Sequence, residues 1–343
     1  MNCNAYSKKR PCILFILGIF LLLIIFTLSI CLGSIPISLE DMKNAFTEND
    51  KIAHSHYIII TTIRLPRVLA ALIGGASIAV SGLMMQIFFQ NPIVEPYILG
   101  ISSGANLFVG LVILGGFTFG MTSMSKTGML IGSFLGAMFI MIMVIFASQK
   151  VKSITTLLII GLMLGYVCSA ATSVLTALAD REKIASFTLW TMGSFSGFKW
   201  SDVRYAYIIT IPFLIIAFLM SKPLNAMLLG EKYARSMGVS IKLFRFLIVI
   251  VSSILTAVIT AFAGPISFIG LAVPHIVRMT FKTNNNRIMI PAVCIYGAVM
   301  TGFCDLIARL IIAPTELPLN AVTSIIGAPI VVYLLVRKKG GTL

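Results

Sequence analysis

Long runs of residues without a charge recur along this chain and dominate its pattern. The first covers residues 12–32, and a helix of about 20 apolar residues is enough to cross the roughly 30 Å hydrocarbon core of a bilayer. Because lipid offers no water to bind backbone groups, a crossing segment satisfies these groups internally, which favours helices. The other charge-free runs that are long enough are 68–94, 97–125, 127–149, 153–179, 205–221, 246–277, 288–304 and 317–336.

The run 246–277 predicts two helices rather than one. A single helix of this length would extend about 48 Å, which is too long for one crossing, and Gly264-Pro265 lies inside it as a helix breaker. The sequence therefore predicts an all-α polytopic membrane protein with about ten spans in one domain, residues 1–343. The stretches 33–56 and 180–204 are expected to be loops. The expected spans are 12–32, 66–89, 96–115, 128–148, 153–178, 204–221, 241–262, 266–281, 288–304 and 318–336.

The distribution of charge predicts the topology. Apolar residues make up 58% of the chain, charged residues 11%, and the net charge is +15. With the N-terminus inside, 16 of the 26 Lys and Arg residues fall in inside segments, which hold only two acids, Glu95 and Glu231. The positive-inside rule then places both termini in the cytoplasm. Nucleic-acid binding is excluded because no basic face with interleaved aromatic residues is present.

The sequence contains no motif of catalysis or cofactor binding. It has no Walker A, H-E-x-x-H or G-x-S-x-G pattern, and its six cysteines form no C-x-x-C pair. His54 and His56 could supply a metal with two ligands at most. We therefore expect a transport protein that is not an enzyme and has no cofactor of its own. An ion-coupled secondary transporter is one alternative, although the spans lack the buried acids that proton-coupled pumps use.

Several short motifs, each weak alone, follow one another in a specific order between about residues 60 and 336. They are Arg64-Leu65-Pro66-Arg67, Gly74-Gly75-Ala76, Ser81-Gly82, Gln86, Asn91-Pro92, Glu95-Pro96, Leu99–Ala105, Gly230-Glu231-x-x-Ala234-x-x-x-Gly238, Gly264–Arg278, Asp305–Arg309, Glu316-Leu317-Pro318 and Gly327-Ala328-Pro329.

This series resembles the FecCD-type permease subunit of ATP-binding-cassette (ABC) importers for iron–siderophore complexes, haem and vitamin B12. The resemblance implies a type II ABC importer permease with ten helices per subunit. It also implies a dimer, formed with a second copy or a close paralogue, whose translocation path lies at the subunit interface. Two cytoplasmic ATPase subunits that bind ATP and Mg, and an extracytoplasmic substrate-binding protein, would complete the transporter in a bacterial or archaeal cytoplasmic membrane.

The resemblance also implies a coupling segment, about residues 222–240, that contacts the ATPase. Two glycines would bend this chain, an acid and an arginine would make polar contacts with the partner, and a small residue lies between them. The residues expected to act here are Gly230, Glu231, Ala234, Arg235 and Gly238. The alternative is an ordinary solvated basic loop.

Ser153, Thr155 and Thr156 open the expected span 153–178 at its inner end, where the family places a cytoplasmic gate. A Ser or Thr residue at a helix start is also a common N-cap, so these residues have two interpretations.

Arg64, Arg67 and Arg309 fall at the outer ends of spans. In the family, arginines at matching positions receive acidic residues of the binding protein, and guanidinium groups pair well with carboxylates. The alternatives are that these arginines extend to lipid headgroups or pair with Asp305.

The cargo is expected to be an iron(III)–siderophore complex, by the frequency of that cargo in the family. Haem and vitamin B12 remain open alternatives.

Overall fold

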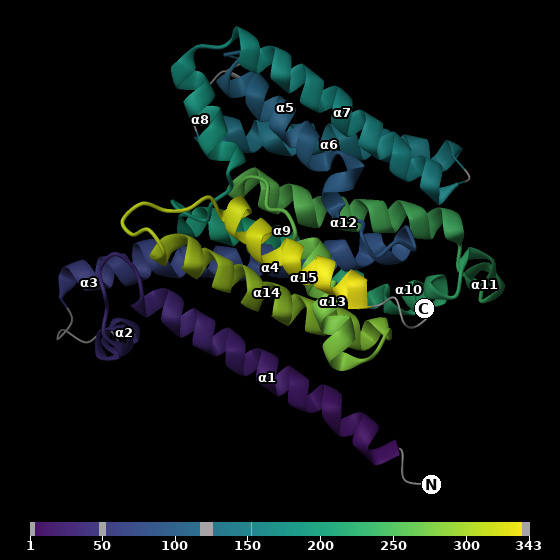
Figure 1. Cartoon of the computed structure of the whole chain (residues 1–343), viewed down its shortest axis with the longest axis horizontal. Coiled ribbons are helices and arrows are strands. Elements are labelled where there is room, and N and C mark those ends of the chain that lie inside the picture. Colours follow the sequence, from purple (N-terminus) through teal and green to yellow (C-terminus); the bar gives the residue numbers. More distant parts are fainter. Residues whose placement is uncertain (1–3, 48–52, 117–125, 152, 338–343) are drawn as a thin grey trace.

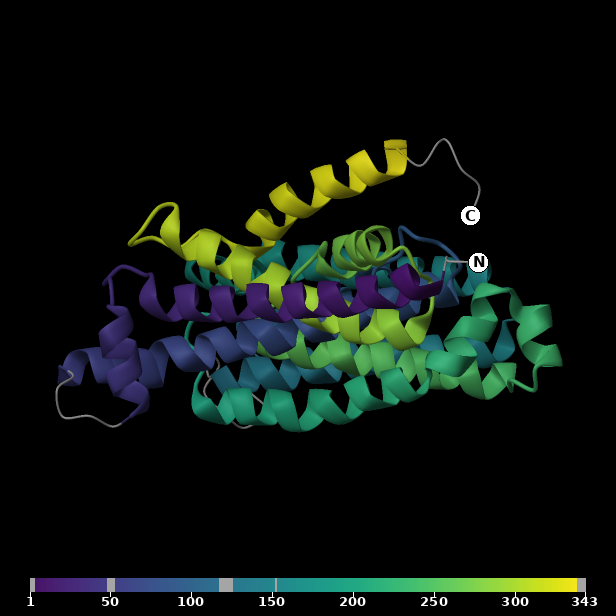
Figure 2. The ribbon, with the colours of Figure 1, turned by 90° about the horizontal axis from the view of Figure 1, so that it is seen from below.

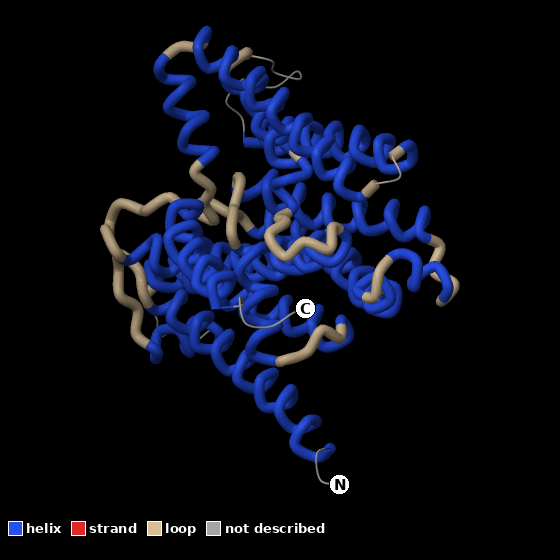
Figure 3. The backbone as a smooth tube through the Cα atoms, turned by 45° about the vertical axis from the view of Figure 1, so that its right-hand side comes forward, coloured by secondary structure: helices blue, strands red, loops and turns tan. Residues whose placement is uncertain are grey.

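The computed structural model describes residues 4–47, 53–116, 126–151 and 153–337, and within these residues it contains helices and loops only (Figures 1 and 3). The longer helices are α1 (Asn4–Cys31), α4 (Leu65–Phe88), α5 (Ile101–Ile113), α6 (Lys126–Lys150), α7 (Ile154–Leu178), α9 (Trp200–Leu219), α12 (Ile241–Ala263), α13 (Ile269–Phe281), α14 (Asn286–Leu310) and α15 (Leu319–Arg337). The shorter elements are α2 (Leu39–Phe46), α3 (His54–Ile58), the π-helical segment η1 (Ile59–Arg64), the 3-10 helix η2 (Pro96–Leu99), α8 (Arg181–Thr191), α10 (Ser221–Leu228) and α11 (Glu231–Ser236).

The longer helices match the ten expected spans one for one. Among the described residues, seven helical stretches are long and apolar enough to cross a membrane, and α5, α13 and α15 are shorter apolar helices. The second span is longer than expected, because α3, η1 and α4 run on as one helical stretch from His54 to Phe88. At 35 residues this stretch is about 52 Å long, so part of it extends beyond a bilayer core of about 30 Å.

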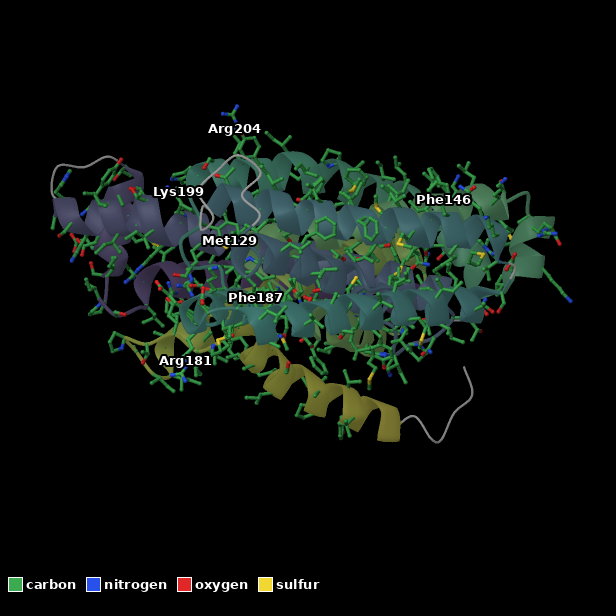
Figure 4. All side chains as sticks on the ribbon, turned by 90° about the horizontal axis from the view of Figure 1, so that it is seen from above. Met129, Phe146, Arg181, Phe187, Lys199 and Arg204 are labelled. Carbon is green, nitrogen blue, oxygen red and sulfur yellow. The ribbon has the colours of Figure 1, made fainter. Side chains whose placement is uncertain are left out.

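The expectation of plain loops over 33–56 and 180–204 is wrong, because each stretch contains a helix. The Ser38 hydroxyl caps α2 by accepting from the Asp41 amide at 3.0 Å. Nδ1 of His56 lies 3.1 Å from Oδ2 of Asp41, so this histidine ties α3 to α2. The hydrogen bond with Ser38 holds the pKa of Asp41 below its usual range, and the hydrogen bond with His56 lowers it to a smaller extent. Phe187 of α8 (Figure 4) is buried and belongs to one apolar cluster with Val109 of α5.

Helix α4 forms the centre of the molecule and is buried along nearly its whole length. Helices α9, α12, α13 and α14 pack around it. Helices α5, α6, α7 and α8 lie together on one side, and α1 lies along the opposite edge (Figure 1). Both described ends of the chain lie at the same end of the bundle as α10 and α11, whereas α2 and α3 lie at the other end (Figures 1 and 2). This arrangement agrees with an even number of crossings.

The predicted break at Gly264-Pro265 is confirmed, because α12 ends at Ala263 and α13 begins at Ile269. Gly264 has φ +75°, a left-handed conformation that favours glycine. The segment between the helices, residues 264–268, is held by neighbours from distant parts of the chain. Asn320 accepts from the Ser267 amide at 3.2 Å, and the Ser194 amide donates to the Ala263 carbonyl at 2.8 Å.

The closest approach to α4 is made by the backbone of α13. A Cβ atom added at Gly82 would lie 2.0 Å from the Gly270 carbonyl oxygen, which is far inside van der Waals contact. Gly75 approaches Gly297 of α14 almost as closely, with an added Cβ 2.3 Å from its carbonyl oxygen. The small residues of α4 therefore determine how near its neighbours can come.

We expect Gly82→Ala to destabilise the protein by about 1–3 kcal/mol, because the new methyl group meets backbone that cannot rotate away. Thermal unfolding of the purified protein in mild detergent measures this change. The control is Gly110→Ala on α5, where an added Cβ has its nearest neighbour at 3.7 Å and the change should be neutral or mildly stabilising. Equal unfolding temperatures for the two variants would contradict the packing argument.

Candidate functional site

Three arginines gather at the end of the bundle that carries α2 and α3. Arg67 of α4 binds two acids from distant positions. Its Nη2 lies 2.9 Å from Oδ1 of Asp305 on α14, and its Nη1 lies 2.5 Å from Oε1 of Glu316. Its Nε also lies 3.1 Å from Oδ2 of Asp305, so the pair with Asp305 is bidentate. We call Arg64, Arg67, Arg309, Asp305 and Glu316 the arginine cluster.

The other two arginines of the cluster bind the C-terminal end of α1. Arg64 donates to the carbonyls of Ile30, Cys31 and Ile35, and its distance to Cys31 is 3.0 Å. Nη2 of Arg309 donates to the Ser29 carbonyl at 2.7 Å. The last carbonyls of a helix have no partner within the helix and carry partial negative charge, so cations are favourable there.

The structure therefore gives each arginine of the cluster a partner within the chain. Arg64, Arg67 and Arg309 are only 5%, 6% and 7% exposed, so their guanidinium groups lie below the surface. The alternative in which one of these arginines pairs with Asp305 is therefore correct for Arg67. Docking of a binding protein on these arginines stays a prediction, and it would require the cluster to open or to act through residues above it.

The coupling segment, residues 222–240, forms two short helices, α10 and α11. Gly230 and Gly238 flank α11 with φ values of +100° and +83°, so both glycines turn the chain as predicted. Ala234 is fully buried, which fixes one side of α11 against the bundle. Arg235 is largely exposed and lies 3.9 Å from Oε1 of Glu231.

The main partner of Glu231 lies on α12 and was not predicted from the sequence. Nη2 of Arg245 approaches Oε2 of Glu231 to 3.0 Å, and Nη1 of Arg245 donates to the Val151 carbonyl at 3.1 Å. Arg245 thereby joins α11 to the connection between α6 and α7. Beside these charges, Leu229 and Met237 are exposed and apolar, which suits contact with another protein.

At the start of α7, Ser153 is the N-cap and its hydroxyl accepts from the Thr156 amide at 3.3 Å. The cap interpretation therefore holds for Ser153. Thr155 and Thr156 are exposed, so they remain available for the predicted gate. The body of α7 packs on α5, α6 and η2, and much of its remaining surface is uncovered, including Tyr166 and Val167.

Comparison with known proteins identifies the family to which this architecture belongs. The profile of the FecCD transport family matches residues 21–337. The chain belongs to this family. It is 34% identical over 323 residues to the hemin transport system permease protein HmuU of Yersinia pestis, covering 94% of this chain and 95% of that protein. It is also 34% identical over 340 residues to the vitamin B12 import system permease protein BtuC of Salmonella typhi, covering 97% and 98% of the two chains.

Solved structures agree with the family. An inward-facing conformation of a putative metal-chelate type ABC transporter superposes with a TM-score of 0.84 at 31% identity, covering 95% of this chain and 99% of that one. PsaBC from Streptococcus pneumoniae gives a TM-score of 0.56 at 13% identity, covering 86% of this chain and 95% of that one, and shows likeness of fold alone. This FecCD chain is therefore an ABC importer permease and a multi-pass membrane protein, and the ion-coupled alternative is not retained.

The arginine cluster should contribute to the stability of this FecCD permease. Arg67→Lys keeps the charge but loses the planar fork that binds Asp305 and Glu316 together, so we expect a loss of about 2–4 kcal/mol. Thermal unfolding in mild detergent measures the loss. Arg204→Lys on α9 is the matched control, because Arg204 lies at the same end and is exposed (Figure 4). If both variants unfold like the wild type, the cluster contributes no stability.

Proposed function

We propose that this FecCD permease passes an iron(III)–siderophore complex from a binding protein to the cytoplasm, energised by partner ATPases. The relatives support cargo of this class, because haem and vitamin B12 are bulky metal chelates and the structural neighbour is described as a transporter of the metal-chelate type. Haem and vitamin B12 are the alternative cargoes for the same path.

The observation that carries this proposal is the uncovered face of α7. Its side chains are apolar or hydroxyl-bearing along the whole helix, and no charge occurs between Ser153 and Ala179. Met163 and Val174 are exposed there, as is Ser173. Such a surface suits a large chelate whose metal is already enclosed, since it offers many weak contacts and no charged group.

A second copy of the chain, or a close paralogue, would complete this path. Thr155 and Thr156 would then lie near the gate at its inner end, next to the coupling segment. Two ATPase subunits would bind the end that carries α10 and α11, and the substrate-binding protein would bind the end that carries α2 and α3. In this orientation both termini would lie in the cytoplasm, which the excess of Lys and Arg in the segments at that end supports.

Uptake into proteoliposomes tests the cargo. The permease is reconstituted with its ATPase and its binding protein, and it is supplied with an iron-59 hydroxamate siderophore, hemin or cyanocobalamin. We expect ATP-dependent accumulation of the siderophore at least about tenfold above the other two, a difference of about 1.4 kcal/mol in selectivity. Preferential uptake of hemin or cyanocobalamin would show that this compound, and not the siderophore, is the cargo. Uptake without ATP would overturn the proposal.

Glu231→Lys tests the coupling role. The new lysine would face Arg245 and Arg235, so the contact between α11 and α12 would turn from attraction to repulsion. We expect ATP-dependent uptake to fall at least tenfold while the permease still inserts and purifies as wild type. Co-purification of the ATPase and the stimulation of its ATP hydrolysis are measured in parallel. The control, Glu40→Lys, reverses an exposed acid of α2 at the other end and should leave co-purification of the ATPase unchanged.

A further inference from the structure

An apolar groove runs along the outside of the bundle between α9 and α14. It lies on the face opposite α15, since α9 and α15 occupy opposite sides of the molecule (Figure 2). The groove has a volume of about 380 Å³, with Ile211 and Phe218 of α9 on one wall, Pro291 and Cys294 of α14 on the other, and Val80 of α4 at its floor. Every residue that lines it is apolar or a cysteine.

Two cations stand at the end of this groove nearest α10. Arg287 precedes Pro291 by four residues and Cys294 by seven, so all three share one face of α14. Lys222 follows Phe218 by four residues, at the start of α10, which continues from α9 after a single residue. Lys222 and Arg287 are both exposed. The groove therefore has a positively charged end and an apolar body.

Three asparagines join α10 to the start of α14 beside Lys222 and Arg287. Nδ2 of Asn225 on α10 donates to Oδ1 of Asn285 at 3.0 Å, and the Asn286 amide donates to Oδ1 of Asn225 at 2.8 Å. Asn225 lies one helical turn beyond Lys222, and Asn286 immediately precedes Arg287. The contact therefore fixes the two cations on adjoining helices at the same end of the groove.

Neither cation is neutralised within the part of the chain that the structure describes. Glu231, the acid of the coupling segment, is bound to Arg245 and Arg235 instead. Ile290, which also lines the groove, is only the fifth residue of α14. The groove thus begins close to the start of α14, and the ends of helices that span a bilayer lie where lipid headgroups meet acyl chains.

We propose that this groove binds an anionic phospholipid, with an acyl chain along α9 and α14 and the phosphate between Lys222 and Arg287. A soluble phosphate would gain nothing from the apolar walls, and a neutral lipid would gain little from the two cations. Basic residues near the membrane surface attract anionic headgroups, and a basic site between helices adds shape to that attraction. Such a lipid would brace α10, and through it the coupling segment, against α14.

Native mass spectrometry of the full-length permease tests the proposal. The protein is released from micelles containing equal amounts of phosphatidylglycerol and phosphatidylcholine with the same acyl chains. We expect the wild type to retain phosphatidylglycerol about tenfold more than phosphatidylcholine. Lys222→Gln combined with Arg287→Gln should abolish this preference and leave retention of phosphatidylcholine unchanged. Cys294→Trp, which fills the groove, should lower retention of both lipids.

The matched control is Lys150→Gln combined with Lys232→Gln, which removes the same charge from α6 and α11 near the same end of the bundle. This pair should keep the wild-type preference. Equal retention of the two lipids by the wild type would overturn the proposal, and so would an equal loss in the control pair. Unchanged retention in Cys294→Trp would show that the lipids bind elsewhere and would also overturn it.

Discussion

The close approach of backbone to backbone around α4 is the constraint on which the rest of the structure depends. Inside a membrane, lipid tails are as apolar as side chains, so helices associate through van der Waals contact and interhelical hydrogen bonds. Gly82 admits α13 and Gly75 admits α14. The Ser81 hydroxyl donates to the Ser252 carbonyl of α12 at 2.8 Å. With three neighbours fixed in this way, the outer helices α1 and α9 pack on a centre that is already rigid.

The arginine cluster solves a different problem at one end of the bundle. Buried charges are costly unless they are paired and hydrogen-bonded. Arg67 meets this condition with two carboxylates, whereas Arg64 and Arg309 meet it with the free carbonyls at the end of α1. The cluster thereby fixes α1 to α4 and α14 at a place where apolar contact alone would allow sliding. The paired charges thus set the position of α1 relative to α4 and α14, whereas the glycine contacts set the distance between α4 and its neighbours.

Sequence reasoning succeeded where the cause is local and failed where it is distant. The length of a charge-free run, the break at Gly264-Pro265 and the turns at Gly230 and Gly238 follow from the residues themselves, and all are found in the structure. Helices α2 and α8 mix polar and apolar residues and are too short to show an apolar run, so loops were expected there. The burial of Arg64 depends on carbonyls about 30 residues away, and Arg245 reaches Glu231 across 14 positions. Such contacts exist only once the helices are packed.

The segment between α12 and α13 has a mechanical consequence. Besides the Ser194 amide bound to Ala263 and the Ser267 amide bound to Asn320, the amides of Leu319 and Asn320 donate to the carbonyls of Gly193 and Met192. These hydrogen bonds therefore join three segments: the end of α12, the start of α15 and the linker after α8. None of the three can move alone without breaking these hydrogen bonds. During a transport cycle, these three segments should therefore move together as one unit. The far ends of α12 and α15 should then undergo the larger displacements.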